Sequence, residues 1–562
     1  MVRRLTGAET RSSRDPYLLV LLAVSAGLGL FQLTWGLPNG NYSWAADALG
    51  PLTVFSIVRR SITPFNSGWF YFKYPLGYPF TLLLSFVPYL GLLLVSGRFR
   101  HPVPTYPYGF ANPEAALYTM TLIGRALSVA TVVAIVALTY GIGRRLLGRP
   151  AGILGAWFVA TAYPIVYYAH TTNLDAAYLF WLTLALWATV VATQSERRWP
   201  YVTLGGAAAM AMATKEQGFA WLLVLPVILV VYAWPALPAQ LGPLRRWWAV
   251  LWNPRTRAGL GAVLVTMAIA NNAVINPRGL LNRFLNLTGH QLPGVTARLT
   301  PLKFSLFKGG AKEWQYVAQL GDVMESTFGL PLLLMALAGA IYLGWQRPRA
   351  AFCLLLPAAA YYFVSLRTHD LITLRYTLPL TVIGSLCAGA LAAAVFVATP
   401  RLAGVVIVGL CTLTLVRAVD LDLLLWNDSR YGAEAWLQEH APVSGVVETY
   451  QKPVYLPRFV GLQHHFVPLE GRSIEGVNER RPDVIVISSA GKKGITHRWN
   501  PDWRQGHTLL VQIPAAQEFL DALEHERLPY RRMARFQQQP RLLRMRITSL
   551  CPEISIFRRV AE

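Results

Sequence analysis

Eight ionisable residues at or near the ends of apolar segments are the candidates for chemistry in this sequence. Charged side chains are costly in or beside a bilayer, so those found there are functional candidates by default. The set combines carboxylates, one histidine and several cations: Asp47, Lys73, Arg125, His170, Asp175, Lys215, Glu216 and Arg375. A carboxylate can act as general base toward a hydroxyl, and Lys and Arg bind phosphate. Together these side chains suit displacement at a sugar carbon with phosphate as the leaving group.

Four of these residues also have a purely structural interpretation. Asp47 and Asp175 could each cap the helix that follows it. Lys73 and Lys215 could anchor a helix end at the membrane interface, with the ammonium group in water. Both alternatives stay open at this level.

A metal site is not expected. His170 has no second His or Cys at a metal-ligand spacing, and a lone buried His is more often a satisfied polar group. The sequence Asp420-Leu421-Asp422 matches a short metal-binding pattern, which we attribute to chance because such motifs have many false positives. We therefore expect no metal and no other cofactor. Arg125 is harder to explain structurally, because an unpaired arginine within a membrane span is destabilising.

The elements that must position these residues are membrane helices. Of the 562 residues, 54% are hydrophobic and 14% are charged, and the apolar residues occur in long runs. Several runs reach the roughly 20 residues that cross a bilayer as a helix. The net charge of +23 comes largely from short loops beside these runs, which indicates orientation by the positive-inside rule and contact with membrane lipids. Nucleic acid is therefore not an expected partner.

The runs predict about eleven transmembrane helices: 17–36, 117–141, 150–168, 174–193, 201–214, 219–234, 258–275, 328–345, 350–366, 375–397 and 402–419. With these spans, most basic loops fall on one side, which should be the cytoplasm. Residues 78–96 are also apolar, but counting them as a span would place the Arg144 and Arg145 loop outside. We expect them to form a helix in the outer interface.

This topology predicts three regions. Residues 1–16 form a cytoplasmic N-terminus, residues 17–419 a transmembrane domain, and residues 420–562 an extracytoplasmic domain. Two large loops, 37–116 and 276–327, face outward. Strand-like segments near 445–450 and 484–489 alternate with helical segments near 433–440 and 515–525, so the last region should be a small α/β domain. The topology brings Asp47, Lys73, Asp175, Lys215 and Arg375 to the outer surface.

Several motifs occur in an order that resembles one known superfamily. They are 43–51 (SWAADALGP), 72–77 (FKYPLG), 141–148 (GIGRRLLG), 151–156 (AGILGA), 164–170 (PIVYYAH), 173–177 (NLDAA) and 213–217 (ATKEQ). Weaker matches are 375–379 (RYTLP), 428–430 (DSR) and 435–437 (AWL). The sequence resembles the GT-C glycosyltransferases of the dolichyl-phosphate-mannose–protein mannosyltransferase and aminoarabinose transferase type, over about residues 15–235.

The resemblance implies inverting transfer of a sugar from a polyprenyl-phosphate donor. It implies that Asp47 is the catalytic base, Asp175 a supporting acid, and Lys73 a contact to the donor phosphate. Lys215 and Arg375 become donor-site cations. One departure is that Ala48 follows Asp47 where many relatives carry a second acid, so any paired-acid or metal role there is in doubt.

We add three residues to this predicted site. Arg125 is a further candidate for the donor phosphate, and His170 and Glu216 are candidates for substrate contacts. The prediction is thus a GT-C-like, polytopic α-helical membrane protein with a small extracytoplasmic α/β domain, in the plasma (inner) membrane. The acceptor could be a glycan, a lipid or a protein. The alternative is a transporter or flippase of a lipid-linked sugar, which should show inverted repeats and mid-membrane charges.

Overall fold

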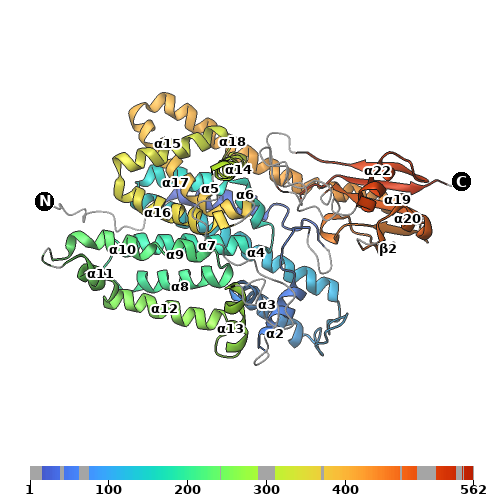
Figure 1. The fold of residues 1–562 in the computed structure, drawn as a ribbon, viewed down its shortest axis with the longest axis horizontal. Coiled ribbons are helices and arrows are strands. Elements are labelled where there is room, and N and C mark those ends of the chain that lie inside the picture. Colours follow the sequence, from blue (N-terminus) through green and yellow to red (C-terminus); the bar gives the residue numbers. More distant parts are fainter. Residues whose placement is uncertain are drawn as a thin grey trace.

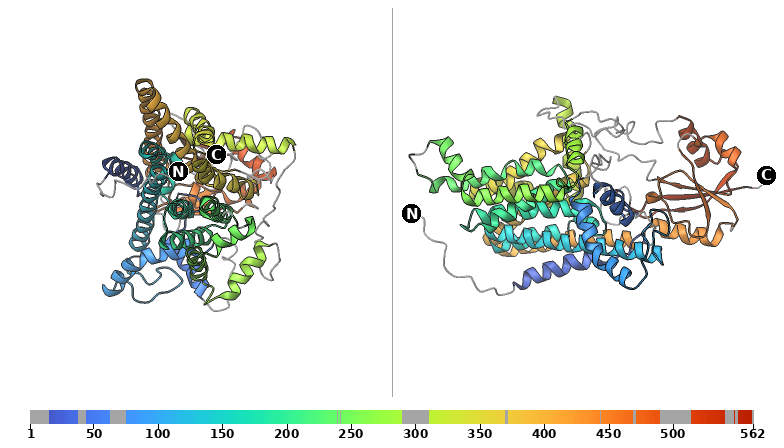
Figure 2. Two further views of the ribbon diagram at one scale, coloured as in Figure 1. Left: turned by 90° about the vertical axis from the view of Figure 1, so that its left-hand side faces the viewer. Right: turned by 90° about the horizontal axis from the view of Figure 1, so that it is seen from below.

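The structure consists of a long helical bundle with a smaller α/β unit at one end (Figure 1). The computed structural model describes residues 15–37, 44–62, 75–238, 240, 242–288, 310–368, 372–442, 444–468, 471–489, 514–539, 547 and 550–560. Two further views show the helices grouped along the long axis and the strands gathered beyond them (Figure 2). The C-terminal part of the chain builds the unit with the strands.

The first half of the bundle contains α1 (Pro16–Leu30), α2 (Pro51–Ile62), α3 (Gly77–Val95), α4 (Pro113–Leu146), α5 (Arg149–Ala160), α6 (Tyr163–Ala169), α7 (Leu174–Ala192), α8 (Trp199–Thr214), α9 (Gly218–Leu222) and α10 (Leu225–Ala233), followed by a 3₁₀ turn (Trp234–Ala236). Several of these helices begin at a proline, whose fixed φ suits the first helical turn. Asn112 caps the long α4, because its side chain accepts a hydrogen bond from Ala115 N at 3.0 Å.

The second half contains α11 (Pro243–Leu251), α12 (Pro254–Ala270), α13 (Pro277–Leu287), α14 (Gly310–Phe328), α15 (Leu330–Gln346), α16 (Pro348–Val364), a 3₁₀ turn (Leu366–Thr368), α17 (Leu374–Ala398) and α18 (Pro400–Trp426). Two pairs of consecutive helices are sharply bent against each other. The angle is 60° between α5 and α6, and 113° between α14 and α15.

The prediction of a polytopic helical membrane protein is confirmed. Within the described part of the chain, six helices are long and apolar enough to cross a membrane, or eight if each bent pair is one span. Each of the eleven predicted segments coincides with a helix or with two consecutive helices, while the total of eleven spans stays a prediction. α3 is also long and apolar enough to cross, so its predicted place in the interface stays a prediction.

Helix α17 packs against α5 and α15. Backbone contacts at two glycines determine its position. A Cβ atom on Gly389 of α17 would lie 2.6 Å from the backbone nitrogen of Gly155 in α5. On the other side, a Cβ atom on Gly339 of α15 would lie 2.1 Å from the carbonyl oxygen of Cys387. Neither contact leaves room for a side chain, so the glycines allow the backbones to touch. The position of α17 in turn determines where Arg375 lies.

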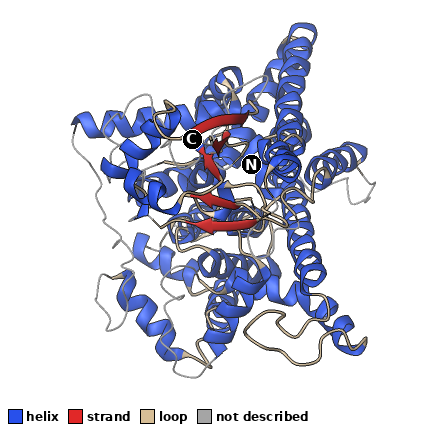
Figure 3. Ribbon diagram, turned by 90° about the vertical axis from the view of Figure 1, so that its right-hand side faces the viewer, coloured by secondary structure: helices blue, strands red, loops and turns tan. Residues whose placement is uncertain are grey.

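The C-terminal unit has a central five-stranded sheet with the strand order β2-β1-β3-β5-β4 (Figure 3). Its elements are α19 (Ser429–His440), β1 (Val446–Thr449), a 3₁₀ turn (Pro453–Tyr455), β2 (Gln463–Phe466), α20 (Ile474–Arg480), β3 (Val484–Ser488), α22 (Pro514–Glu524), β4 (Tyr530–Phe536) and β5 (Ile554–Arg559). β1 pairs in parallel with β2 and β3, whereas β5 pairs antiparallel with β3 and β4.

The central strand β3 is buried on both faces. Val484 and Val486 pack with residues of α19, whereas Ile485 and Ile487 pack with residues of α20 and α22. Such burial of alternate residues on opposite sides is the pattern of a sheet covered by helices on both faces. The predicted small α/β region is therefore confirmed. The predicted boundary at residue 420 falls within α18, which continues to Trp426, so the division into domains stays a prediction.

Candidate active site

Asp47 and Arg375 form an ion pair at the end of the bundle where α17 begins. Arg375 Nη1 donates a hydrogen bond to Asp47 Oδ2 at 2.6 Å. The Asp47 side chain is 44% exposed and the Arg375 side chain 31%, so a ligand can reach both. The helix after Asp47 begins only at Pro51, and Asp47 therefore does not cap it. The contact with Arg375 and the absence of a capping role favour a functional role for Asp47 over a structural one.

The backbone at Asp47 has an unusual conformation. Its φ is +62°, in the left-handed region that few non-glycine residues adopt, although Asp enters it more readily than most. Hydrogen bonds on both sides hold it there. Asn173 Nδ2 donates to Ala46 O at 2.9 Å, and Thr172 Oγ1 donates to Leu49 O at 2.9 Å. The Asp47 turn is thus docked onto the turn that precedes α7.

Asp175 and Lys215 form a second ion pair next to that turn. Lys215 Nζ donates to Asp175 Oδ1 at 2.8 Å. Asp175 lies in the first turn of α7, whose N-cap is Asn173, and Lys215 directly follows α8. The Asp175 side chain is buried and the Lys215 side chain is 13% exposed. Asp175 is therefore a partner of Lys215 and not a helix cap.

Tyr376 connects the two ion pairs. The Lys215 ammonium lies 4.7 Å from the centre of its ring, and the Arg375 guanidinium lies 5.0 Å from it. Arg375 Nη2 also donates to the Tyr376 hydroxyl at 3.2 Å. Both cations are thus held by an aromatic ring as well as by a carboxylate. The result is a continuous chain of contacts from Asp47 to Asp175.

These contacts leave hydrogen-bonding capacity for an anion. Arginine carries five N–H donors and lysine three, and the contacts above use two on Arg375 and one on Lys215. The site also lies at the N-terminal ends of α7 and α17, where unsatisfied backbone N–H groups favour negative charge. The arrangement can hold a phosphate group beside a carboxylate.

Two other predicted site residues, Glu216 and Lys73, take no part in this chain of contacts among the described residues. Glu216 forms an ion pair with Arg283 of α13, so it faces that helix, although it adjoins Lys215. The Glu216 side chain is one-third exposed and Arg283 is buried. Lys73 lies outside the described residues.

Arg125 and His170 are fully buried and contact the chain that follows α1. Arg125 Nη1 donates to Leu33 O at 2.6 Å. His170 Nε2 lies 2.6 Å from Phe31 O and 3.7 Å from Asp422 Oδ1. The structure therefore does not bring these two side chains together with the exposed Asp47 and Arg375. They hold the segment that leads into the loop containing Asp47.

The C-terminal unit contacts the same loop through Trp44, which is fully buried. The guanidinium groups of Arg430 and Arg458 lie 4.3 Å and 5.4 Å from the centre of its ring. The Tyr431 ring packs against it at 4.8 Å. Arg458 Nη1 also donates to Leu37 O at 2.8 Å. The loop that carries Asp47 is thus anchored on the C-terminal unit.

A buried ion pair supports this contact. Arg430 Nε and Nη2 donate to the two oxygens of Asp428 at 2.8 Å and 2.6 Å, and both side chains are fully buried. Trp35 Nε1 donates to Asp428 Oδ2 at 3.1 Å. Asp428 therefore joins the segment after α1 to the beginning of α19.

Sequence reasoning missed several residues that shape this site. Tyr376 and Asn173 lie within the motifs at 375–379 and 173–177, but neither side chain carries a charge at neutral pH, so charge did not mark them as site residues. Arg283 lies far from the site in sequence and in no quoted motif, whereas Arg430 lies in the weaker match at 428–430, which does not predict its contact with Trp44. In the described part of the chain, no three His, Cys, Asp or Glu side chains are grouped to hold a metal.

Comparison with known proteins identifies part of the chain. A family model described as dolichyl-phosphate-mannose-protein mannosyltransferase matches residues 120–246. Over residues 120–246, the chain is similar to this family. The matched part runs from α4 to α11 and includes Asp175 and Lys215, whereas Asp47 and Arg375 lie outside it. The resemblance that the motifs predicted is confirmed over residues 120–246. No curated protein matches the chain.

Solved structures similar to this chain include an oligosaccharyltransferase, ArnT and a protein O-mannosyltransferase complex. The oligosaccharyltransferase of Archaeoglobus fulgidus is 10% identical, with a TM-score of 0.47, and the match covers 90% of this chain and 71% of that one. ArnT of Cupriavidus metallidurans bound to undecaprenyl phosphate is 13% identical, with a TM-score of 0.45 and coverage of 97% and 98%. The protein O-mannosyltransferase Pmt1-Pmt2 complex of S. cerevisiae is 14% identical, with a TM-score of 0.31 and coverage of 45% and 33%.

Proposed function

We propose that this protein is an inverting glycosyltransferase of the plasma membrane. It moves a sugar from a polyprenyl-phosphate donor to a hydroxyl group of an acceptor outside the cytoplasm. The N-terminus is cytoplasmic, and the active site and the C-terminal unit are extracytoplasmic. The description of the family model that matches residues 120–246 names a lipid-phosphate sugar, dolichyl-phosphate mannose. This supports a polyprenyl-phosphate sugar as the donor.

One observation carries the proposal. The exposed carboxylate of Asp47 lies in hydrogen-bond contact with Arg375, and Tyr376 links that pair to Lys215 and Asp175. A base and two cations with unused donors are therefore adjacent at the mouth of the bundle. This combination suits a reaction in which a hydroxyl loses a proton while a phosphate departs.

The reaction proceeds by a single displacement. The acceptor oxygen forms a bond to the anomeric carbon of the sugar, and the bond from that carbon to the phosphate oxygen breaks. Asp47 takes the proton of the acceptor hydroxyl through the carboxylate oxygen that Arg375 leaves open. The leaving polyprenyl phosphate keeps the electron pair of the broken bond, and the configuration at the anomeric carbon inverts.

The cations stabilise the phosphate as its negative charge grows. Arg375 and Lys215 keep N–H donors for it, and the helix N-termini of α7 and α17 add partial positive charge. Asp175 holds the Lys215 ammonium in place through the 2.8 Å hydrogen bond. We include Lys73 as a further cation for the same phosphate, because its motif at 72–77 resembles a basic motif of the superfamily. The acceptor is a glycan, a lipid or a protein.

A transfer assay with the full chain tests the proposal. The purified protein is reconstituted in vesicles of native membrane lipid with radiolabelled polyprenyl-phosphate mannose or polyprenyl-phosphate aminoarabinose. Label that leaves the lipid-phosphate fraction is counted. We expect Asp47→Asn to lower the rate by about 10²- to 10⁴-fold, the usual contribution of a general base.

Glu439→Gln is the matched control, because Glu439 is a highly exposed acid on α19 and should not change the rate. Equal rates for Asp47→Asn and wild type would refute the role of Asp47 as base. If wild-type protein releases no more label than empty vesicles with either donor, the transferase proposal itself is wrong.

A further inference from the structure

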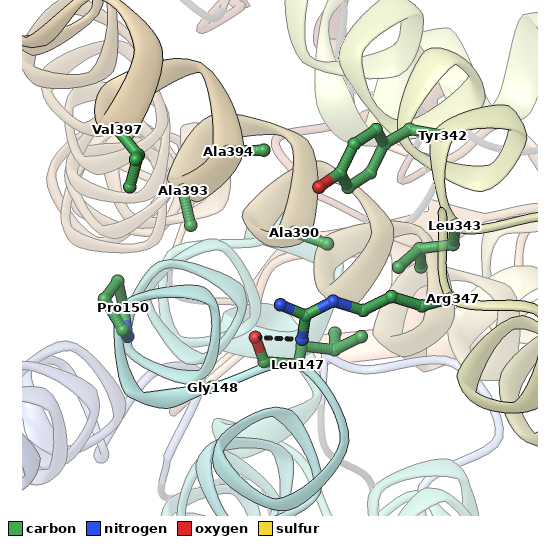
Figure 4. A pocket seen from close by; sticks show the side chains of 10 residues that line it. All are labelled: Leu147, Gly148, Pro150, Tyr342, Leu343, Arg347, Ala390, Ala393, Ala394 and Val397. Atoms are coloured by element: carbon green, nitrogen blue, oxygen red, sulfur yellow. Dashed lines mark hydrogen bonds between the residues drawn. The ribbon is translucent and has the colours of Figure 1, made fainter. Parts of the chain in front are cut away.

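A cavity lies at the end of the bundle opposite to the candidate active site (Figure 4). Its volume is about 440 Å³, within the range of roughly 300–1,000 Å³ typical of ligand pockets. Its walls come from the α4–α5 turn, the end of α15 and the end of α17: Leu147, Gly148, Pro150, Tyr342, Leu343, Arg347, Ala390, Ala393, Ala394 and Val397.

The small residues of α17 create this space. The helix touches α5 and α15 at Gly389 and beside Gly339, where no side chain fits. Beyond this contact, Ala390, Ala393 and Ala394 present only methyl groups to the gap between the helices. Because Leu147, Leu343 and Val397 complete the wall, most of the surface suits a hydrocarbon chain.

Arg347 gives the cavity a charged side. Its side chain is exposed, and Nη1 donates to Leu147 O at 2.8 Å. A guanidinium has five N–H donors, so one carbonyl oxygen leaves most of them available for an anion. The Tyr342 hydroxyl points toward the same space in the close-up view.

The surroundings of the cavity favour a negative ligand. Arg149 is engaged by Asp15, and Arg145 donates to the Gln194 side chain. Arg347 has no such side-chain partner among the described residues. Along α17, the cavity lies roughly 30 Å from Arg375 at 1.5 Å per residue. Because α17 is long and apolar enough to cross a membrane, the cavity and Arg375 lie near opposite ends of such a span.

We propose that this cavity binds one anionic glycerophospholipid of the membrane. The lipid phosphate contacts the Arg347 guanidinium, and one acyl chain lies on the alanine surface of α17. The length of α17 separates this cavity from the proposed donor site at Arg375. The phosphate of a lipid bound at Arg347 and the phosphate of a donor bound at Arg375 would lie at opposite ends of α17. The proposal does not depend on the proposed transfer reaction.

Native mass spectrometry of the full chain tests it. The protein is delipidated in mild detergent and titrated with dioleoyl-phosphatidylglycerol or dioleoyl-phosphatidylcholine. We expect one phosphatidylglycerol to be retained more strongly than phosphatidylcholine. Arg347→Gln should weaken that retention about fivefold, the usual effect of one basic residue at an anionic lipid surface. Ala394→Leu should weaken the retention of both lipids by filling the cavity.

Two further variants separate this effect from misfolding and from general charge. Arg401→Gln removes an equal charge outside the cavity and should behave as wild type. Arg347→Lys keeps the charge and should restore part of the preference for phosphatidylglycerol. The proposal is overturned if Arg347→Gln matches Arg401→Gln, or if wild type retains both phospholipids equally. Displacement of phosphatidylglycerol by undecaprenyl phosphate would assign the cavity to the polyprenyl lipid instead, and would also overturn it.

Discussion

A 2.6 Å hydrogen bond joins Arg375 to Asp47, although 328 residues separate them in the sequence. The contact fastens the turn before α2 to the first turn of α17. A carboxylate that accepts a charge-assisted hydrogen bond is fixed in direction, and its second oxygen remains available. The orientation of the proposed base therefore depends on a helix near the end of the membrane region.

Replacing Arg375 tests this dependence. Arg375→Gln removes the cation and should lower kcat for sugar transfer by about ten- to hundredfold, because a hydrogen bond to a charged group contributes about 1.5–3 kcal/mol. Arg375→Lys keeps the charge but loses the planar fork, and should recover only part of the rate. Steady-state kinetics with the labelled donor measures both. A kcat for Arg375→Gln equal to that of wild type would contradict the assignment.

Tyr376 should act through its ring. Tyr376→Phe keeps the face that contacts Lys215 and Arg375, and loses only the hydroxyl. Tyr376→Leu removes the ring, and should raise the KM for the lipid donor about threefold to thirtyfold, because each cation–π contact contributes about 0.5–2 kcal/mol. The two variants are compared in the same transfer assay. Equal KM values for Phe and Leu at this position would exclude a role for the aromatic ring.

Asn173 is predicted to position the Asp47 turn without touching substrate. Asn173→Ala removes the hydrogen bond to Ala46 O, and should cost about 1 kcal/mol of stability. The rate should fall further than stability alone explains, since displacement of a reacting group by about 1 Å can cost 10²-fold. Thermal unfolding and kcat are measured on the same preparation. Loss of stability with an unchanged kcat would make Asn173 purely structural.

The buried pair of Arg430 and Asp428 should dominate the stability of the junction between the bundle and the C-terminal unit. Arg430→Gln leaves Asp428 buried without its cation and should destabilise the protein by about 3–5 kcal/mol. The double variant Arg430→Gln with Asp428→Asn removes both charges and should recover part of this loss. Thermal melting in detergent distinguishes the two. A double variant less stable than the single one would contradict this account.

Asp15 predicts a pH dependence. Hydrogen bonds from Arg149 and Tyr140 hold the pKa of Asp15 well below its usual range. Because the folded-state pKa is the lower one, this stabilisation is present above the unfolded pKa of about 4 and is lost as the pH falls below it. Asp15→Asn keeps a capping side chain and should cost about 0.5–1 kcal/mol near pH 7, because the Arg149 partner is half-exposed and water screens the ion pair. The difference in melting temperature should shrink as the pH falls below about 4 and vanish only below the folded-state pKa, and a constant difference would refute the mechanism.

The membrane helices were predictable because each one leaves a local signal. Long apolar runs, prolines at helix starts and arginines at helix ends all occur within a few residues of the elements that they mark. The break between α14 and α15 is marked locally by Gly329, whose φ is +74°, and by Pro331. The 113° angle of the bend has no such signal, because it depends on what the two helices pack against. The α/β character of the C-terminal segment was visible in its apolar strands, but the antiparallel place of β5 in the sheet was not.

The candidate site was predictable only as a set of residue types. Asp47, Asp175, Lys215 and Arg375 all occur near helix ends, and the structure brings them together. Which acid pairs with which cation depends on the packing of α17 against α5, set by glycines that carry no charge. Arg125 and His170 resembled site residues because charge in a membrane is rare. Both contact backbone carbonyl groups of the segment after α1, and His170 also lies near Val166 O and Asp422, contacts that no sequence pattern identifies.

The packing of Trp44 between Arg430 and Arg458 has a consequence for protein engineering. A chimaera that received its C-terminal segment from a distant relative would lose both guanidinium partners of Trp44, unless those positions were grafted as well. The loop with Asp47 would then lack its support, even with every residue of the membrane region intact. Exchange of C-terminal segments between related proteins should therefore succeed only when the loop with Trp44 and the two arginines are transferred together.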